Sequence, residues 1–251
     1  MSLVLSPSAR DGLLLARLRR AGIAMPPERP VPGESSFRLE FNADRLCLVD
    51  TSNRRARPYF VDLARARRPG GGADLLRRAL GPPGRTVVDA TAGFGGDAVH
   101  LARSGYNVIA VERCAVIAAM LADGLERLAE PAIRERIRLL AGDSREILPR
   151  LSAHVVYLDP MFDAGVPTKS LPRRAMVLAR ALAGDDDDAA ALLDLARAHF
   201  PRVVVKRPDK APPLAGGVHH DHRGKTVRYD VYLDHGRPRA SEAGASSADN
   251  P

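Results

Sequence analysis

The amino-acid sequence predicts an α/β protein with a mainly parallel sheet covered by helices on both faces. From residue 85 onward, short apolar segments alternate with amphipathic helical segments. A glycine-rich turn joins the first of these strands to the first of these helices. The last candidate strand follows a loop instead of a helix. The first two features are typical of parallel strands with helical crossovers, and the third predicts an antiparallel edge strand.

The individual elements follow from the spacing of the apolar residues. We expect strands at 86–90, 107–112, 137–141, 154–159 and 202–206. We expect helices at 96–104, 115–129, 145–150, 171–182 and 188–198. Thr226–Leu233 alternates between apolar and polar residues, and we expect it to be the antiparallel edge strand.

Residues 1–66 are expected to form a small β-rich N-terminal domain. The alternating segment Phe37–Phe41 and the apolar run Leu46–Val49 are joined by a short polar turn, which predicts a β-hairpin. Tyr59–Val61 is a further candidate strand.

Two other parts of the chain complete the expected organisation. Gly12–Ala21 is a candidate helix, and the proline-rich segment Met25–Pro32 cannot be a helix interior. Residues 67–234 form the larger domain. Residues 235–251 are rich in Ser, Ala, Gly and Asp, and we expect a disordered tail there.

The composition indicates a cytoplasmic globular protein with an anionic partner. Hydrophobic residues make up 45% of the 251 residues, and no apolar run reaches the roughly 20 residues of a membrane span. Cys47 and Cys114 are too few for a disulfide framework or a zinc site. The net charge of +8 favours a polyanion such as nucleic acid, although a bias toward arginine codons would also produce it, since only four of the 38 basic residues are lysine.

The segment Val87–Asp97 has the pattern of a nucleotide-binding loop. Two valines lead into Asp89, and the turn that follows contains Gly93, Gly95 and Gly96. Glycine lets the backbone adopt positive φ and lets a ligand approach closely. The helix that begins there directs free N–H groups into the same space.

Two cofactor classes use such a loop. Gly93-x-Gly95-x-x-Ala98 satisfies the dinucleotide fingerprint, in which the helix N-terminus holds a pyrophosphate. S-adenosylmethionine instead carries a cationic amine, for which Asp89 and Asp97 are better suited. The loop alone leaves both open.

Three further acidic or polar positions follow the next two strands. Glu112 ends the second strand, where a carboxylate accepts hydrogen bonds from ribose hydroxyls in either cofactor class. Asp143 and Ser144 follow the third strand, where they could contact an adenine edge, while Ser144 would also suit a helix N-cap.

The tetrapeptide Asp159-Pro160-Met161-Phe162 distinguishes the two cofactor classes. Methyltransferases that act on amino groups carry a related tetrapeptide at the end of the fourth strand. An exocyclic base amine is a poor nucleophile, and a carboxylate that accepts its N–H bonds directs its lone pair at the methyl group. Pro160 would hold the turn rigid, and Phe162 could stack on a base. An oxidoreductase has no need of this motif.

Lys206 and Arg207 end the fifth strand on the same rim, where they could bind RNA phosphates or form a structural ion pair. The histidines of His219-His220-Asp221-His222 are too close in sequence to converge on one ion, so we expect no metal.

These motifs together resemble the bacterial 16S ribosomal RNA guanine-N2 methyltransferase family, type J. The resemblance spans roughly residues 58–233. It rests on four segments, namely Asp89-Ala-Thr-Ala-Gly-Phe-Gly-Gly-Asp97, Val111-Glu-Arg113, Val156-Tyr-Leu-Asp-Pro-Met-Phe162, and Val203-Val-Val-Lys-Arg-Pro-Asp209 with Ala211-Pro-Pro-Leu214.

The resemblance implies a Rossmann-like class I methyltransferase fold with a seven-stranded sheet and S-adenosylmethionine as cofactor. It implies a substrate in 16S ribosomal RNA or the small ribosomal subunit, without a membrane partner. Carried over by motif, the cofactor contacts are Gly96, Asp97, Glu112, Arg113, Asp143, Ser144 and Asp159. Gly96 stands where the family often has arginine, and Asp143 where it commonly has serine.

We therefore hypothesise a methyl transfer from S-adenosylmethionine to the exocyclic N2 of a guanine. Asp159, Pro160 and Phe162 are the expected catalytic residues, with Asp159 bound to the target amine or to the cofactor beside it. Two alternatives remain at this point. One is an NAD-dependent oxidoreductase that uses the Gly93-x-Gly95 loop, and the other is a non-catalytic RNA-binding protein with the same fold.

Overall fold

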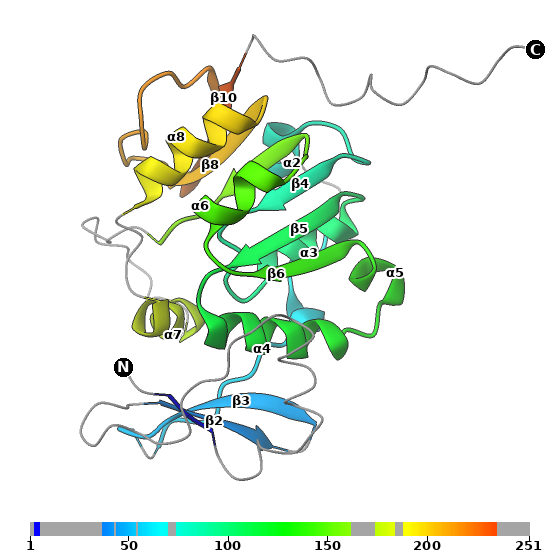
Figure 1. The fold of residues 1–251 in the computed structure, drawn as a ribbon, viewed down its shortest axis with the longest axis vertical. Helices are drawn as coiled ribbons and strands as arrows, with labels where there is room; N and C mark the ends of the chain where they lie inside the picture. The colour runs from blue at the N-terminus through cyan, green and yellow to red at the C-terminus, as the bar shows by residue number, and fades with distance from the viewer. Residues whose placement is uncertain are drawn as a thin grey trace, which may run out of the picture.

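The larger part of the molecule is a single twisted sheet with helices packed on it, and a small separate sheet lies beneath it (Figure 1). The computed structural model describes residues 3–5, 37–42, 44–53, 55–69, 74–161, 174–183 and 188–234. The candidate helix at 12–21, the proline-rich segment, Phe162 and the tail from residue 235 lie outside these described residues.

The main sheet has seven strands in the order β6-β5-β4-β7-β8-β10-β9. Their bounds are β4 Thr86–Asp89, β5 Asn107–Glu112, β6 Ile137–Ala141, β7 Val155–Leu158, β8 Arg202–Pro208, β9 His220–Arg223 and β10 Val227–Leu233. Strands β6, β5, β4, β7 and β8 pair in parallel, and β10 runs antiparallel to both of its neighbours. The predicted mainly parallel sheet is confirmed.

The position of the antiparallel strand differs from the sequence prediction. β10 is antiparallel as expected, but it lies one strand inside the edge, because β9 pairs with its outer side. The sequence His220-Asp-His-Arg223 has no apolar residue and therefore gives no strand signal. It forms a strand because β10 offers it a row of unpaired backbone groups.

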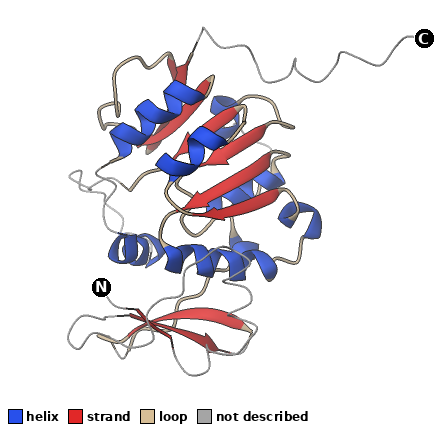
Figure 2. Cartoon of the chain, in the orientation of Figure 1, coloured by secondary structure: helices blue, strands red, loops and turns tan. Residues whose placement is uncertain are grey.

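Helices cover both faces of this sheet (Figure 2). The helices are α2 Leu75–Leu80, α3 Gly96–Arg103, α4 Ala115–Glu126, α5 Pro131–Arg134, α6 Ser144–Ile147, α7 Arg174–Ala183 and α8 Ala189–His199, with short 3-10 turns η2 Leu63–Arg65 and η3 Leu148–Arg150. Buried residues of α2, α3 and α4 belong to one core cluster, and those of η3 and α8 belong to the other. Strand residues such as Val87 and Val88 are fully buried and face opposite clusters.

The predicted hairpin forms β2 Phe37–Asn42 and β3 Arg45–Asp50, and a short strand β1 Leu3–Leu5 pairs in parallel with β2. The candidate strand at 59–61 is reduced to a single bridge between Tyr59 and Leu48. Neither β2 nor β3 contains a proline or a glycine. Burial alternates at the start of β2, as predicted, whereas three consecutive residues of β3, Leu46, Cys47 and Leu48, are buried.

The hairpin is docked on α4 of the larger unit, below which it lies in Figure 1. Asp123 of α4 is only 3% exposed, and its Oδ2 accepts hydrogen bonds from Leu46 N at 3.2 Å and from the Arg127 guanidinium at 2.8 Å. Arg127 also donates to Val61 O. Gly124 makes room for this contact, because a Cβ there would lie 2.7 Å from Val61 Cγ1. The hairpin and the helices of the sheet thus share one core cluster, and the division at residue 66 stays a prediction.

We predict that Asp123→Ala lowers the free energy of unfolding by about 3 kcal/mol, since it leaves a buried amide N–H and a guanidinium without their acceptor. The loss is measured by urea denaturation. Glu126→Ala, an exposed position later in the same helix, is the control and should change stability little. Equal stability of the two variants would show that Asp123 does not hold the hairpin to α4.

Candidate active site

The turn between β4 and α3 is held open by two glycines in the left-handed region. Gly93 has φ +54° and Gly95 has φ +79°, and Gly95 occupies the N-cap position of α3. At Gly95 a Cβ would lie 2.3 Å from Leu121 Cδ1, so a side chain there would displace Leu121 of α4 and would also strain the positive φ. At Gly93 and Gly96 a Cβ would meet no heavy atom within 4 Å. The loop therefore faces open space on one side and is fixed by α4 on the other.

An aromatic contact connects this loop to the N-terminal segment. The rings of Phe94 and Tyr59 lie 5.1 Å apart at an interplanar angle of 57°. Tyr59 in turn exchanges two backbone hydrogen bonds with Leu48 of β3. The glycine loop is thus supported by the hairpin as well as by α4.

Glu112 fixes the loop from the neighbouring strand. Its Oε2 accepts a hydrogen bond from Gly93 N at 2.8 Å, and its Oε1 accepts one from Cys114 N at 2.7 Å. The carboxylate is 6% exposed and lies at the end of β5, directly beside β4. Glu112 thus ties the end of β5 to the glycine loop, and its role toward ribose hydroxyls stays a prediction.

Three aspartates and one lysine, which we call the carboxylate cluster, meet at the carboxyl ends of the central strands. Asp89 ends β4, Asp97 lies in the first turn of α3, Asp159 follows β7, and Lys206 lies in β8. Lys206 Nζ donates to Asp159 Oδ2 at 2.6 Å and to Asp97 Oδ2 at 3.2 Å. Ligands of open α/β sheets bind at this edge.

The ionisation of the cluster is set by burial and by mutual charge. Burial, followed by the charges of Asp97 and Asp159, raises the pKa of Asp89 well above its ordinary value. Burial would also raise the pKa of Asp97, but Lys206 and the Tyr157 hydroxyl outweigh it and hold that pKa below its ordinary value. The cluster therefore carries more carboxylates than cations, which suits a positively charged ligand.

Two members of this arrangement were not expected from the sequence. Tyr157 OH donates to Asp97 Oδ2 at 2.7 Å, and Thr91 Oγ1 accepts a hydrogen bond from Asp159 N at 2.7 Å. The period of a strand could have identified Tyr157, because it precedes Asp159 by two residues and so points to the same face. No pattern in the sequence singles out Thr91, whose role depends on the pairing of β4 with β7.

The Asp-Pro-Met corner is attached to the cluster through its first residue. Asp159 is anchored by its backbone to Thr91 and by its side chain to Lys206. Pro160 is buried and Met161 is half-buried, and the fourth residue of the motif, Phe162, lies outside the described residues.

The polar residues after β6 divide between two roles. Ser144 is buried, and its hydroxyl donates to Ala90 O at 2.6 Å, which ties the ends of β6 and β4 together. Asp143 is the N-cap of α6, and its carboxylate accepts a hydrogen bond from Arg145 N at 2.8 Å. The cap is therefore one residue earlier than Ser144, the residue that the sequence suggested. Arg113 pairs with Asp188, at the N-terminus of α8, at 3.2 Å.

Lys206 and Arg207 point to opposite faces of β8, as neighbours in a strand must. Arg207 is buried, and its guanidinium donates to Pro212 O at 2.8 Å, which holds the loop after β8. The structure therefore brings Lys206, and not Arg207, to the carboxylate cluster.

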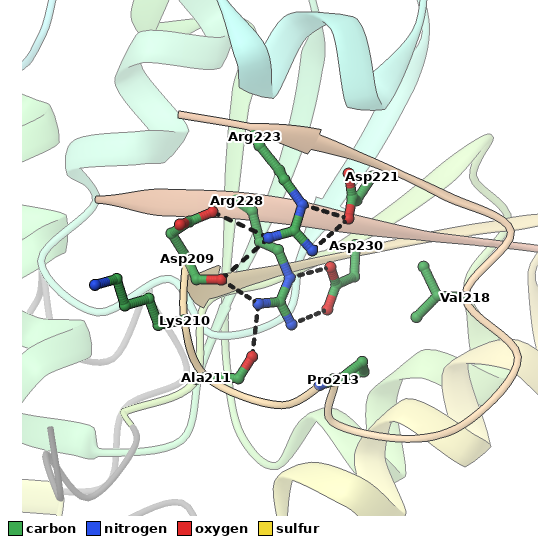
Figure 3. Close-up of a pocket in the computed structure, with 9 residues that line it drawn as sticks. All are labelled: Asp209, Lys210, Ala211, Pro213, Val218, Asp221, Arg223, Arg228 and Asp230. Atoms are coloured by element: carbon green, nitrogen blue, oxygen red, sulfur yellow. Dashed lines mark hydrogen bonds and ion pairs between the residues drawn. The ribbon is translucent and has the colours of Figure 1, made fainter. Parts of the chain in front are cut away.

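A pocket of about 420 Å³ lies on the Arg207 side of β8 and β10 (Figure 3). Its charged residues are three basic and three acidic ones, namely Lys210, Arg223, Arg228, Asp209, Asp221 and Asp230. Arg228 pairs with Asp230 at 2.6 Å, and Arg223 pairs with Asp221 and Asp209. These ion pairs fix the loop after β8. The equal numbers of acidic and basic residues distinguish this pocket from the carboxylate cluster.

Comparison with known proteins agrees with this geometry. Residues 28–234 match the model of a family of S-adenosylmethionine-dependent methyltransferases. The chain is 40% identical over 221 residues to the ribosomal RNA small subunit methyltransferase J of Dechloromonas aromatica, a match that covers 81% of this chain and 90% of that protein. It is 39% identical to the protein of the same name from Pectobacterium atrosepticum, with 92% and 98% covered.

The chain belongs to the ribosomal RNA small subunit methyltransferase J family. A crystal structure of an S-adenosylmethionine-dependent methyltransferase from Neisseria gonorrhoeae has the same fold, with a TM-score of 0.70, 29% identity and coverage of 95% of this chain and 98% of that one. The Rossmann-like class I fold and S-adenosylmethionine as cofactor follow from this membership.

No helix among the described residues is long and apolar enough to span a bilayer. No group of three or more His, Cys, Asp or Glu residues in the same part of the chain could hold a metal ion.

We predict that Glu112→Gln weakens binding of S-adenosylmethionine by at least about tenfold, because an amide has one acceptor oxygen and cannot receive both Gly93 N and Cys114 N. Isothermal titration calorimetry measures the change. Glu146→Gln, at an exposed position of α6, is the matched control and should bind like the wild type. Unchanged affinity in Glu112→Gln would contradict the role of this carboxylate in holding the loop.

Proposed function

We propose that this protein transfers a methyl group from S-adenosylmethionine to the exocyclic N2 of a guanine in small-subunit ribosomal RNA. The observation that supports it best is the position of Asp159 at the strand ends, held by Thr91 and Lys206 beside the glycine loop. The named substrates of the relatives support the choice of small-subunit ribosomal RNA. We expect the reaction in the cytoplasm, where ribosomal subunits are assembled.

The cofactor site fits S-adenosylmethionine by shape and by charge. Open space beside Gly93 and Gly96 would admit the methionyl part, and Glu112 would receive the ribose hydroxyls. Gly95 shapes the turn, and Asp89 and Asp97 would face the cationic end. The main-chain turn at Asp143 and Ser144 lies beyond β6, where it would meet the adenine, with Arg113 beside the ribose.

The bound cofactor supplies a methyl group that is already activated by its sulfonium. The protein must therefore align the guanine N2, the methyl carbon and the sulfur in one line. In our proposal the Asp159 carboxylate accepts an N–H bond of the guanine amine and directs its lone pair at the carbon. Pro160 keeps this corner rigid, and Phe162 stacks on the base.

Bond changes in the proposed transfer are simple. The N2–C bond forms as the C–S bond breaks, and the leaving group is S-adenosylhomocysteine. The methylated amine becomes acidic and loses one proton to water, so no general base is required. Residues of the chain act by binding and orientation.

The two alternatives have less support. A dinucleotide would place two phosphate charges against Asp89 and Asp97, which is unfavourable at short range. Membership in a methyltransferase family also disfavours an oxidoreductase. For a non-catalytic RNA-binding protein, nothing would maintain Asp89, Glu112 and Asp159 together around one loop.

The proposal is tested by methyl transfer to defined RNA. Small ribosomal subunits or 16S ribosomal RNA from cells that lack the protein are incubated with it and with tritiated S-adenosylmethionine. Digestion to nucleosides should then give labelled N2-methylguanosine. Binding of RNA without incorporation of label, or label in another nucleoside, would contradict the proposed function.

We predict that Asp159→Ala lowers the rate of this transfer by at least about 100-fold, because the amine loses the acceptor that orients it. Circular dichroism and the melting temperature should stay close to the wild type, since the side chain lies at the end of a strand. Asp194→Ala, at an exposed position of α8, controls for the loss of an acidic residue. Near-normal turnover in Asp159→Ala would remove this residue from the mechanism.

A further inference from the structure

Lys206 is the cation of the carboxylate cluster. Its ammonium is paired with carboxylates inside the site, whereas a residue that binds RNA phosphate would direct its ammonium at the RNA. Its ammonium lies 2.6 Å from Asp159 Oδ2 and 3.2 Å from Asp97 Oδ2, and its side chain is 25% exposed. Both partners belong to the proposed methyl-transfer site. One side chain of β8 thus connects the first turn of α3 to the Asp-Pro-Met corner.

The backbone fixes where this ammonium can go. Lys206 pairs with Tyr229 in the antiparallel register of β8 and β10, and the three residues before it, 203–205, pair with β7, so the strand that carries it is held on both sides just before this position. The Tyr229 ring lies 6.5 Å from the ring of Tyr157, whose hydroxyl donates to the same Asp97 oxygen that Lys206 approaches. Tyr229 and Lys206 share one face of the sheet, because directly paired residues of neighbouring strands point to the same side, and the lysine ends at the two carboxylates.

Charge accounts for the need for a cation at this point. Asp97 and Asp159 share the one ammonium through a single oxygen each, and Asp89 is buried close enough to act on both. Without the lysine, like charges at this distance in a half-buried site would favour protonation of one carboxylate. A protonated Asp97 or Asp159 would attract a cationic cofactor or an amine N–H less strongly.

The same contacts disfavour a role in holding RNA. A phosphate could bind Lys206 only by drawing the ammonium away from two carboxylates, which repel the phosphate themselves. Although burial alone would lower it, the charges of Asp159 and Asp97 raise the pKa of Lys206 well above its ordinary value, so the side chain stays charged. Its positive charge is paired with Asp97 and Asp159 inside the site.

We propose that Lys206 is a positioning residue of the methyl-transfer site, which keeps Asp97 and Asp159 ionised and aimed at the donor and the target amine. This inference rests on the function proposed above and assigns a role to a residue that the sequence associates with RNA phosphates. Its loss should alter the pH dependence of cofactor binding and the turnover number.

The sign of the pH effect follows from the carboxylates. With Lys206 in place the pKa of Asp97 is low, so Asp97 stays ionised through the mildly acidic range. Without Lys206, burial and the neighbouring acids raise that pKa, and the affinity for a cation falls as the pH decreases. The single substitutions at Lys206 leave unchanged the other charged and titratable groups that face the cluster, namely Asp89, Asp97, His100, Tyr157, Asp159, Tyr229 and Arg67.

The experiment measures binding of S-adenosylmethionine by calorimetry at pH 7.0 and 5.0, without RNA, in the full-length protein. Between these two values the ligand's own amine stays protonated. We expect Lys206→Met to lose about tenfold more affinity over this interval than the wild type, equivalent to about one unit of pKa change. Lys206→Arg, which keeps the charge, should follow the wild type. Lys210→Met, which removes an exposed lysine four residues later, should also follow it.

A second pair of measurements separates this role from a merely structural one. Adding Asp97→Asn to Lys206→Met should remove the additional pH dependence, because the carboxylate that titrates is gone. With saturating cofactor and varied RNA concentration, Lys206→Met should lower kcat by about tenfold or more while KM for RNA changes little. If Lys206→Met does not fold, Lys206→Gln is measured in its place.

The outcomes distinguish the inference from the proposed function. A wild-type protein that fails to bind S-adenosylmethionine, or to methylate RNA, contradicts the proposed function. A wild type that does both, with Lys206→Met retaining its pH dependence and kcat, overturns only the role of Lys206. Weaker RNA binding in Lys206→Met, with cofactor binding unchanged at both pH values, would show that Lys206 binds RNA phosphate and would overturn its positioning role.

Discussion

The carboxylates of Asp89, Asp97 and Asp159 are brought together where two parallel strands end and a helix begins, and one lysine is placed among them. Carboxylates repel each other in a half-buried site, so this arrangement is stable only if cations offset the charge. Lys206 supplies one positive charge, and a cationic donor would supply another. The parallel sheet makes the arrangement possible because the carboxyl ends of β4, β7 and β8 meet at one edge.

The rest of the molecule supports this edge from two directions. Glu112 and Ser144 tie the ends of β5 and β6 to the glycine turn and to β4. On the other side, Leu121 of α4 and the Tyr59 ring close around Gly95 and Phe94, and α4 in turn carries the N-terminal hairpin through Asp123. The small sheet is therefore part of what positions the glycine loop, and the absence of a side chain at Gly124 lets Val61, in the segment after β3, pack closely on α4.

Much of the fold could be predicted from the sequence because each strand of the parallel sheet is a run of apolar residues with a helical segment after it. The placement of acidic residues at the strand ends could also be predicted, since Asp89, Glu112 and Asp159 directly terminate three of these apolar runs. β9 could not be predicted, because His220–Arg223 has no apolar residue and is a strand only beside β10. The contacts of Lys206 and Thr91 could not be predicted either, since they depend on which strands are neighbours in the sheet and not on any spacing along the chain.

The central claim is that the corner at Asp159 holds a base amine against a donor that lies over the strand ends. A crystal structure with sinefungin, which carries an amine in place of the transferable methyl group, tests it most directly. The account predicts that the ribose contacts Glu112, that the amino-acid end lies beside Gly93 and Gly96, and that the amine points to Asp159. An analogue bound elsewhere, or an Asp159 side chain that turns away from the bound analogue or is sealed from solvent, would contradict it.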